Sequence, residues 1–149
     1  MADNSLTITV SRITDQITDK MKSRGTRACN ELVTAKNNVL RGQRSGRKYR
    51  KPNTNAFYTA SAPGEPPAVR TGQYRREWNE KTYATGGVGS LTVHAEIEST
   101  VRTDGGRYNL GTLLEEGSDG GKIAPRPHKD KIIEEAKPKV LAIFNESYR

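Results

Sequence analysis

An apolar residue recurs every three or four positions over a long stretch near the start of the chain, and this spacing constrains the fold more than any other feature. The members of the series are Val10, Ile13, Ile17, Met21, Ala28, Leu32, Ala35 and Val39. Steps of three and four place them on one face of a helix. The spacing predicts an amphipathic helix over residues 9–41, which needs another part of the protein to cover its apolar face.

Individual residues predict the ends and the middle of this helix. Thr9 or Ser11 can cap its start through a side-chain oxygen, and Gly42 is placed to end it. Gly25 stands where another apolar member of the series would fall. Because glycine weakens a helix interior by about 1 kcal/mol relative to alanine, we expect a bend or a close helix crossing at Gly25.

A basic block follows the helix. Its cations are Arg41, Arg44, Arg47, Lys48, Arg50 and Lys51, with no acidic residue among them. Like charges repel, so we expect a mobile loop unless nucleic acid or an acidic partner orders it. Tyr49, Phe57 and Tyr58 are suited to stacking on bases. Two interpretations stay open: a solvated loop, or a sequence-independent contact with the phosphates of nucleic acid.

A proline arm completes the connection 42–70. Pro63, Pro66 and Pro67 fix their own backbone angles and push the preceding residues toward extended conformations. The pattern predicts an extended segment. It acts either as a stiff linker or as a strap that lies across another surface, such as a neighbouring subunit.

Residues 71–101 have the spacing of strands. The alternating apolar residues of the clearer strand are Leu91, Val93, Ala95 and Ile97. Alternation predicts one buried and one solvated face. We expect an earlier extended segment to enter the sheet after Thr71-Gly72, to include Tyr74 and to continue to Tyr83. The glycines of residues 85–89 predict a hairpin loop between the two segments.

The last third of the chain predicts two helical segments, a short patch at 108–117 and a helix at 129–147. The apolar face of the second is Ile132, Ile133, Ala136, Val140, Ile143 and Phe144. Pro138 should kink or restart this helix, because its ring opposes the carbonyl four residues earlier. The order of elements predicts one α+β domain over residues 1–149. In it the long N-terminal helix and the C-terminal helix pack on a small, mostly antiparallel sheet, with long arms and loops.

The composition indicates a chain that assembles. Only 32% of its 149 residues are hydrophobic, so one copy can bury little apolar surface. The net charge of +8 favours polyanionic partners. No apolar run is long enough for a membrane span, and the start lacks the pattern of a signal peptide. Cys29, the single cysteine, excludes an internal disulfide and multi-cysteine metal sites.

No catalytic constellation is visible in the sequence. His94 falls on the polar side of a predicted strand, where we expect it at the surface, and it shares no metal-ligand spacing with His128. Glu135-Ala136-Lys137 matches an acid-x-lysine fragment of some nucleases, but those sites use a strand and this tripeptide lies in a helical pattern. We predict no catalytic residue, no metal and no cofactor, and a protein that is not an enzyme.

Three motifs occur in order after the long helix: PGEPPAVRTGQYRREW, RYNLGTLLEEGSDG and IAPRPHKDKIIEEA. They resemble the tailed-phage family of head–tail connector and tail-completion proteins typified by the HK97 tenth gene product, over residues 60–144. The matching positions are Thr71-Gly72 with Tyr74-Arg75, then Tyr108 and Glu115-Glu116-Gly117, then Pro125-Arg126-Pro127. His128 departs from the family pattern, which usually has a large apolar residue there. The basic block is also heavier than the family requires.

The resemblance implies a structural virion protein of the phage neck that forms a ring, a hexamer rather than a dodecamer, between the DNA-filled head and the tail. The implied partners are further copies, portal-side adaptor or stopper proteins, and a tail terminator or tail-tube protein. Genomic DNA passing through the lumen would contact the basic block. Assembly would take place in the host cytoplasm, without a membrane partner.

Contacts between subunits or rings are implied for Pro63, Glu65, Pro66, Pro67, Thr71, Gly72, Tyr74, Arg75, Glu116, Gly117, Pro125, Arg126 and Pro127. The alternative function is a sequence-nonspecific nucleic-acid-binding module, whose affinity for duplex would fall steeply with salt.

Overall fold

A computed structural model describes residues 2–87 and 89–148, and residues 2–14 only by the course of their helix. The elements are α1 (Ala2–Arg41), β1 (Lys48–Arg50), β2 (Phe57–Thr59), α2 (Gln73–Arg76), β3 (Trp78–Thr85), β4 (Thr92–Ser99), α3 (Leu110–Glu116) and α4 (Lys129–Phe144). In this part of the chain, helices accompany two small antiparallel sheets, which confirms the predicted α+β class.

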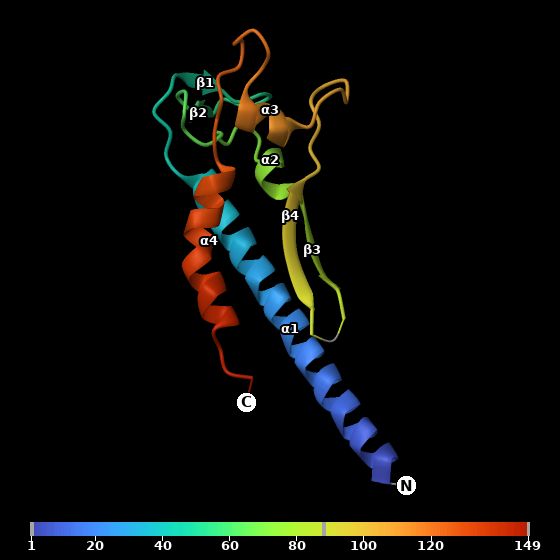
Figure 1. The fold of residues 1–149 in the computed structure, drawn as a ribbon. Helices are drawn as coiled ribbons and strands as arrows, with labels where there is room; N and C mark the ends of the chain where they lie inside the picture. The colour runs from blue at the N-terminus through green and yellow to red at the C-terminus, as the bar shows by residue number, and fades with distance from the viewer. Residues whose placement is uncertain (1, 88, 149) are drawn as a thin grey trace.

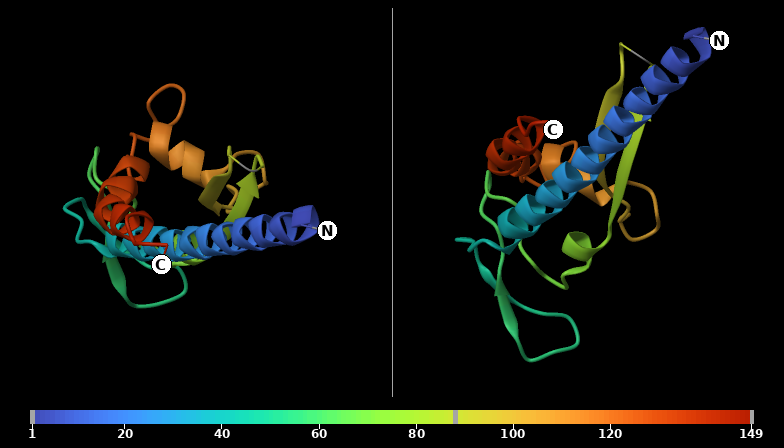
Figure 2. Two further views of the ribbon diagram at one scale, coloured as in Figure 1. Left: turned by 60° about the horizontal axis from the view of Figure 1, so that its bottom comes forward. Right: turned by 90° about the horizontal axis from the view of Figure 1, so that it is seen from below.

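The long helix α1 organises the other elements (Figure 1). The helix α4 and the β3–β4 hairpin both pack along it. The helices α2 and α3 and the β1–β2 hairpin gather around its C-terminal end, whereas its N-terminal end runs out past the rest of the chain (Figures 1 and 2).

The helix α1 is longer than predicted. It begins at Ala2 rather than at residue 9, so Thr9 and Ser11 lie inside it and the prediction that they cap its start was wrong. Residues 2–8 contain no glycine or proline that would end a helix, which allows the extension. The C-terminal prediction was correct, because the helix ends at Arg41, directly before Gly42.

The core lies between α1 and α4. Ala35, Ile132 and Ala136 form its buried centre, and partly buried apolar side chains surround them. Two alanines at this contact let the helix backbones approach closely, since their side chains end at Cβ. The predicted apolar faces of the two helices therefore cover each other in part, and Ile97 of β4 packs against the same cluster. Ile17 of the predicted α1 face and Ile133 and Phe144 of the predicted α4 face are exposed instead.

Gly25 marks a close approach, but the partner is the β3–β4 hairpin rather than another helix. A Cβ atom at Gly25 would lie 2.9 Å from Cγ2 of Thr82 and closer still to Cγ1 of Val93. Glycine is therefore required here by the strands that cross the helix. The bend or helix crossing expected at Gly25 is replaced by a hairpin that contacts an uninterrupted helix.

Replacing Gly25 with alanine should lower the free energy of unfolding by about 1–2 kcal/mol, because overpacking outweighs the gain in helix propensity. Urea denaturation of the full chain measures the change. Adding Val93→Ala, which removes the nearest atom, should recover part of the loss. Asn30→Ala, at an exposed position of the same helix, is the control and should be neutral or stabilising. A more stable Gly25→Ala variant would contradict this packing.

The strands form two separate two-stranded sheets instead of one. Strand β1 pairs with β2, and β3 pairs with β4 from Trp78 opposite Ser99 to Thr85 opposite Thr92. The second pairing confirms the predicted hairpin, although residue 88 of its loop lies outside the described residues. The extended segment expected after Thr71-Gly72 was wrong: Gly72, with a φ of 81°, leads into α2, which carries Tyr74.

The last two helices follow the sequence prediction closely. The helix α3 lies within the predicted patch, and the side chain of Asn109 caps it by accepting a hydrogen bond from the backbone N–H of Thr112. The helix α4 ends at Phe144 rather than at 147 and continues through Pro138 without restarting. The carbonyl that the proline ring opposes belongs to Glu134, an exposed residue.

The chain after α4 is held against α1 by a buried arginine. The guanidinium of Arg24 donates hydrogen bonds to the carbonyl oxygens of Phe144, Glu146 and Ser147. A cation is favourable at a helix C-terminus, where carbonyl groups lack partners. The neighbouring Arg27 makes a paired contact with both carboxylate oxygens of Glu146 at 2.6 Å. These contacts fix the end of α4.

Candidate functional site

Three segments that are far apart in the sequence meet at the start of α4. The hydroxyl of Tyr74 on α2 lies 2.6 Å from Nε2 of His128, and Oε2 of Glu115 on α3 lies 2.8 Å from Nδ1 of the same ring. We refer to Tyr74, Glu115 and His128 as the helix junction. Each of the three sequence motifs contributes one of these residues, so the motifs come together in space.

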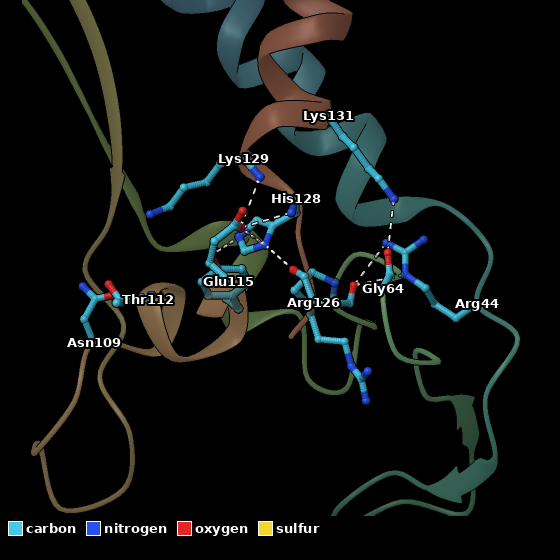
Figure 3. Close-up of polar contacts among 11 residues, drawn as sticks. Arg44, Gly64, Asn109, Thr112, Glu115, Arg126, His128, Lys129 and Lys131 are labelled. Atoms are coloured by element: carbon cyan, nitrogen blue, oxygen red, sulfur yellow. Dashed lines mark hydrogen bonds and ion pairs between the residues drawn. The ribbon is translucent and has the colours of Figure 1, made fainter. Parts of the chain in front are cut away.

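His128 is fully buried at the centre of the helix junction. Its Nδ1 atom faces two acceptors, the Glu115 carboxylate and the Arg126 carbonyl, each at 2.8 Å, and therefore carries the ring proton (Figure 3). Its Nε2 atom then accepts the hydrogen bond of the Tyr74 hydroxyl. Burial lowers the pKa of His128, so the ring is neutral at pH 7 and its contact with Glu115 is a hydrogen bond rather than an ion pair.

Glu115 also holds the first residues of α4. Its Oε2 atom accepts the backbone N–H groups of His128 at 3.1 Å and Lys129 at 3.3 Å. A carboxylate at a helix N-terminus satisfies free N–H groups and is favoured by the helix dipole. Burial, followed by the charge of Glu115, raises the pKa of Tyr74, so its hydroxyl stays protonated and can donate. The junction therefore fixes α2, α3 and α4 relative to one another.

This role of His128 was not predicted from the sequence. The residue stood out only as a departure from an apolar pattern, with no predicted contact. Its partners Tyr74 and Glu115 lie 54 and 13 positions away along the chain. No local spacing links them, so only the folded arrangement reveals the junction.

The proline arm is held by its own chain. The backbone N–H of Gly64 donates to the Pro125 carbonyl at 3.2 Å, and Lys131 donates to the Gly64 carbonyl at 3.4 Å (Figure 3). Pro67 is buried, and its carbonyl accepts two hydrogen bonds from Arg44. The prediction that the arm is extended throughout was wrong: the chain turns at residues 62–65, where the Glu65 N–H donates to the Ala62 carbonyl at 3.1 Å and Gly64 has a φ of 82°. The middle of the arm cannot act as a free strap. Pro63 remains exposed.

Glu65 ties the arm to the residues after α1. Its carboxylate accepts hydrogen bonds from Ser45 Oγ at 2.6 Å, from the Ser45 N–H at 3.1 Å and from the Ala62 N–H at 2.9 Å. These bonds favour the charged form and lower the pKa of Glu65 to about 2.

We expect an NMR titration of the Glu65 side-chain carboxyl to show a midpoint near 2. The lowered pKa means that Glu65 contributes to stability above its ordinary pKa of 4.5, and that this contribution disappears as the pH falls toward 2. Glu65→Gln should therefore narrow the stability difference between pH 7 and pH 2. The control is Glu116→Gln at an exposed position, which should change this stability difference less than Glu65→Gln does. A Glu65 midpoint near 4.5 would show that the three hydrogen bonds are absent in solution.

The structure divides the basic block into two parts. Arg44 turns inward, donates to the Val39 and Pro67 carbonyls, and has its pKa lowered by burial. The block is not a plain loop, because residues 48–50 form strand β1 and backbone carbonyls accept hydrogen bonds from Arg44. Exposed cations of the block are Arg41, Arg47, Lys48 and Arg50, whereas Lys51 is half-buried.

The β1–β2 hairpin combines exposed aromatic rings with the cations of the block. Tyr49 lies opposite Tyr58, with ring centroids 6.1 Å apart, and Arg50 lies opposite Phe57. Tyr49 is 48% exposed and Phe57 is 66% exposed. Large apolar rings beside cations on an open strand pair are typical of a surface that binds a partner.

Other implied contact residues surround the helix junction. The backbone N–H of Gln73 reaches Thr71 Oγ1 at 3.3 Å, Gly72 is buried, and the Arg75 carbonyl accepts a bond from the buried Lys36 at 3.1 Å. A Cβ atom at Gly117, whose φ is 80°, would lie 2.7 Å from the Ile123 carbonyl oxygen. Pro66 and Pro127 are half-buried, and Glu116 and Pro125 are exposed. Several implied contact residues therefore have close neighbours within one copy.

A cleft of about 620 Å³ lies beside the arm. Its walls come from the end of α1, from residues 52–61, from residues 67–75, from residues 101–104, from α3 and from residues 123–126. We call it the arm cleft. Its lining is apolar in the main and includes the side chain of Arg126. No pattern in the sequence predicts it, because its walls come from segments that are far apart along the chain.

The remaining candidate residues do not gather into a site. His94 is half-buried and stacks on Tyr83, with ring centroids 4.6 Å apart, rather than lying free at the surface. Glu135 of the nuclease-like tripeptide lies in α4 and accepts a bond from Asn38 at 2.7 Å. Among the described residues, no cluster of His, Cys, Asp and Glu could hold a metal ion, and no helix is long and apolar enough to cross a membrane.

No protein-family model, curated protein or solved structure matches the chain. A comparison therefore assigns neither a family nor a function. The resemblance to phage connector proteins rests on the three sequence motifs.

Proposed function

We propose that the chain is a structural virion protein of the tailed-phage neck, and that its copies form a ring between the DNA-filled head and the tail. The order and spacing of the three motifs support this function. In the folded chain the motifs meet at the helix junction, which gives them a shared structural role. The proposal assigns no catalytic residue and no cofactor.

The observation that carries the proposal is an apolar stripe on the outer side of α4. Ile133 is 56% exposed, Leu141 is 51% exposed and Phe144 is 37% exposed. These positions lie on one side of the helix, while Ile132, Ala136 and Ile143 face inward and are buried. A helix with apolar residues on two sides needs a second partner, and a neighbouring copy in a ring provides one.

Open strand edges support the same conclusion. Each sheet has two strands, so every described strand has one edge without a partner strand. Isolated two-stranded sheets have little stability of their own, and open edges invite pairing with other chains. Ring closure would cover both the edges and the α4 stripe.

Negative-stain electron microscopy of the purified full chain tests this function directly. We expect closed rings with a central opening. Isolated small particles or open filaments would contradict a ring.

The β1–β2 hairpin favours a second candidate, a module that binds nucleic acid without sequence preference. On one face of the strand pair it places Lys48 and Arg50 with the exposed ring of Phe57, which lies opposite Arg50, so that phosphate contacts and base stacking are available side by side. The exposed ring of Tyr49 lies on the other face. In a ring, the same surface would contact DNA in the lumen.

Glutamine replacement of Arg47, Lys48, Arg50 and Lys51 tests the second candidate. If the hairpin binds duplex, the slope of log affinity against log salt should decrease by about 3 to 4 units, because each phosphate contact contributes about 0.9. Fluorescence polarisation with a short duplex measures it. The control removes four exposed charges elsewhere, at Arg76, Lys122, Lys131 and Lys137. An equal decrease in both variants would exclude a specific role for the hairpin.

A further inference from the structure

The arm cleft has the walls of a peptide-binding site. Its apolar lining includes Leu40, Pro67, Val69, Leu110, Leu113 and Ile123. A volume of about 620 Å³ lies in the range of clefts that hold small ligands or a few residues of a peptide. Ile123 is still 39% exposed, although it lines an apolar surface. The cleft therefore has apolar area available to a ligand.

The charge of the lining is strongly positive. Arg70, Arg75, Arg102 and Arg126 line the cleft, against one acidic residue, Asp104. Four cations around an apolar cleft favour a ligand that carries negative charge.

Arg126 supplies an independent sign of a missing partner. Its Nη1 atom is buried and has no hydrogen-bond partner, and it is the sole buried side-chain nitrogen or oxygen in that condition among the described residues. Figure 3 shows its guanidinium directed away from His128 and Glu115. Leaving a charged donor buried and unpaired is unfavourable, and a carboxylate is the partner that a guanidinium fork fits best.

The backbone around Arg126 holds this donor in place. Its N–H donates to the Leu114 carbonyl at 2.6 Å, and its carbonyl accepts from His128. Both contacts belong to the helix junction and its surroundings, so the arginine is presented to the cleft by a fixed part of the fold. A preorganised donor loses little freedom when a ligand binds.

We propose that the arm cleft binds an extended segment of a partner protein in which a carboxylate lies next to apolar side chains. The carboxylate pairs with Arg126, and the apolar side chains contact the walls of the cleft. Nucleic acid fits this cleft poorly, because most of its apolar lining is aliphatic. Its two aromatic residues, Tyr58 and Tyr74, are half-buried and contact Tyr49 and His128. The inference goes beyond the proposed function: it concerns a ligand site on a single copy and holds with or without a ring.

A displayed library of random eight-residue peptides, selected on the full chain, provides the test. We expect the selected peptides to carry Asp or Glu beside Leu, Ile or Val. Selected peptides are then synthesised, and their binding is measured by fluorescence polarisation. Replacing the acidic residue with its amide should weaken binding at least tenfold, whereas amidating the C-terminus should matter only if the terminal carboxylate is the group recognised.

Protein variants locate the site. Arg126→Gln should weaken binding at least tenfold, and Arg102→Gln at the exposed rim should weaken it by a smaller factor. Arg107→Gln, an exposed arginine outside the cleft, should leave it unchanged. If Arg126→Gln fails to fold, two measurements still test the proposal. One is the binding of the substituted peptides to the unaltered protein, and the other is the binding of the selected peptides to the Arg102→Gln variant. Failure to select acidic peptides, or binding that survives loss of the peptide carboxylate, would overturn the proposal.

Discussion

Replacing His128 with alanine is expected to lower the free energy of unfolding by about 3 kcal/mol, measured by urea denaturation, since it opens a cavity and leaves buried polar groups unpaired. The ring is fully buried and connects α2, α3 and the start of α4. Its removal leaves the Tyr74 hydroxyl and the Arg126 carbonyl without their partner. Few single substitutions in this chain should cost as much.

A double-mutant cycle separates the hydrogen bond from the packing. His128→Leu keeps most of the side-chain volume but leaves the Tyr74 hydroxyl without its acceptor. We therefore expect it to lower the free energy of unfolding by about 1–3 kcal/mol. Adding Tyr74→Phe removes the stranded hydroxyl and should recover much of that loss. His94→Ala is the matched control, and at its half-buried position it should cost less than about 1 kcal/mol. Equal losses for the two alanine variants would contradict a special role for His128.

Replacing Leu141 with glutamate is expected to convert the assembled protein to monomers. The residue is 51% exposed in one copy, so the fold should survive, but an unpaired carboxylate buried at a subunit interface costs several kcal/mol. Because a ring repeats the same interface, the loss applies at every contact. Analytical ultracentrifugation measures the change in mass.

Ala142→Glu is the control for this assembly prediction. Ala142 is also exposed and is adjacent in sequence, but it lies about 100° further round the helix, away from the α4 stripe. It introduces the same charge and should leave the assembly intact. If Leu141→Glu keeps the mass of the unaltered protein, the stripe is not the interface. If both variants dissociate, the interface covers more of α4 than the stripe.

Periodic patterns predicted the elements of this fold well. The three- and four-residue steps that end at Val39 locate α1, and the alternation from Val93 to Ile97 locates β4. The pairing of β4 with the preceding strand could also be predicted, since a glycine-rich loop between two extended segments favours a hairpin. Such signals are local, and local spacing is what a single sequence displays directly.

Features that depend on distant neighbours were not predicted. Gly25 is explained by Val93 and Thr82 of the hairpin, and Arg44 turns inward because Val39 and Pro67 present carbonyl oxygens to it. The short helix α2 replaces an extended segment, since Gly72 adopts a left-handed conformation from which a helical turn begins. The buried His128 belongs to the same group.

The solution mass of the purified protein, measured by multi-angle light scattering at low and moderate salt, with and without a short duplex, tests the ring most directly. We expect one closed species near six times the 16.5 kDa of a single copy, with or without duplex. A 16.5 kDa monomer at every protein concentration, which binds duplex with an affinity that falls steeply with salt, would contradict the ring and favour the nucleic-acid-binding module.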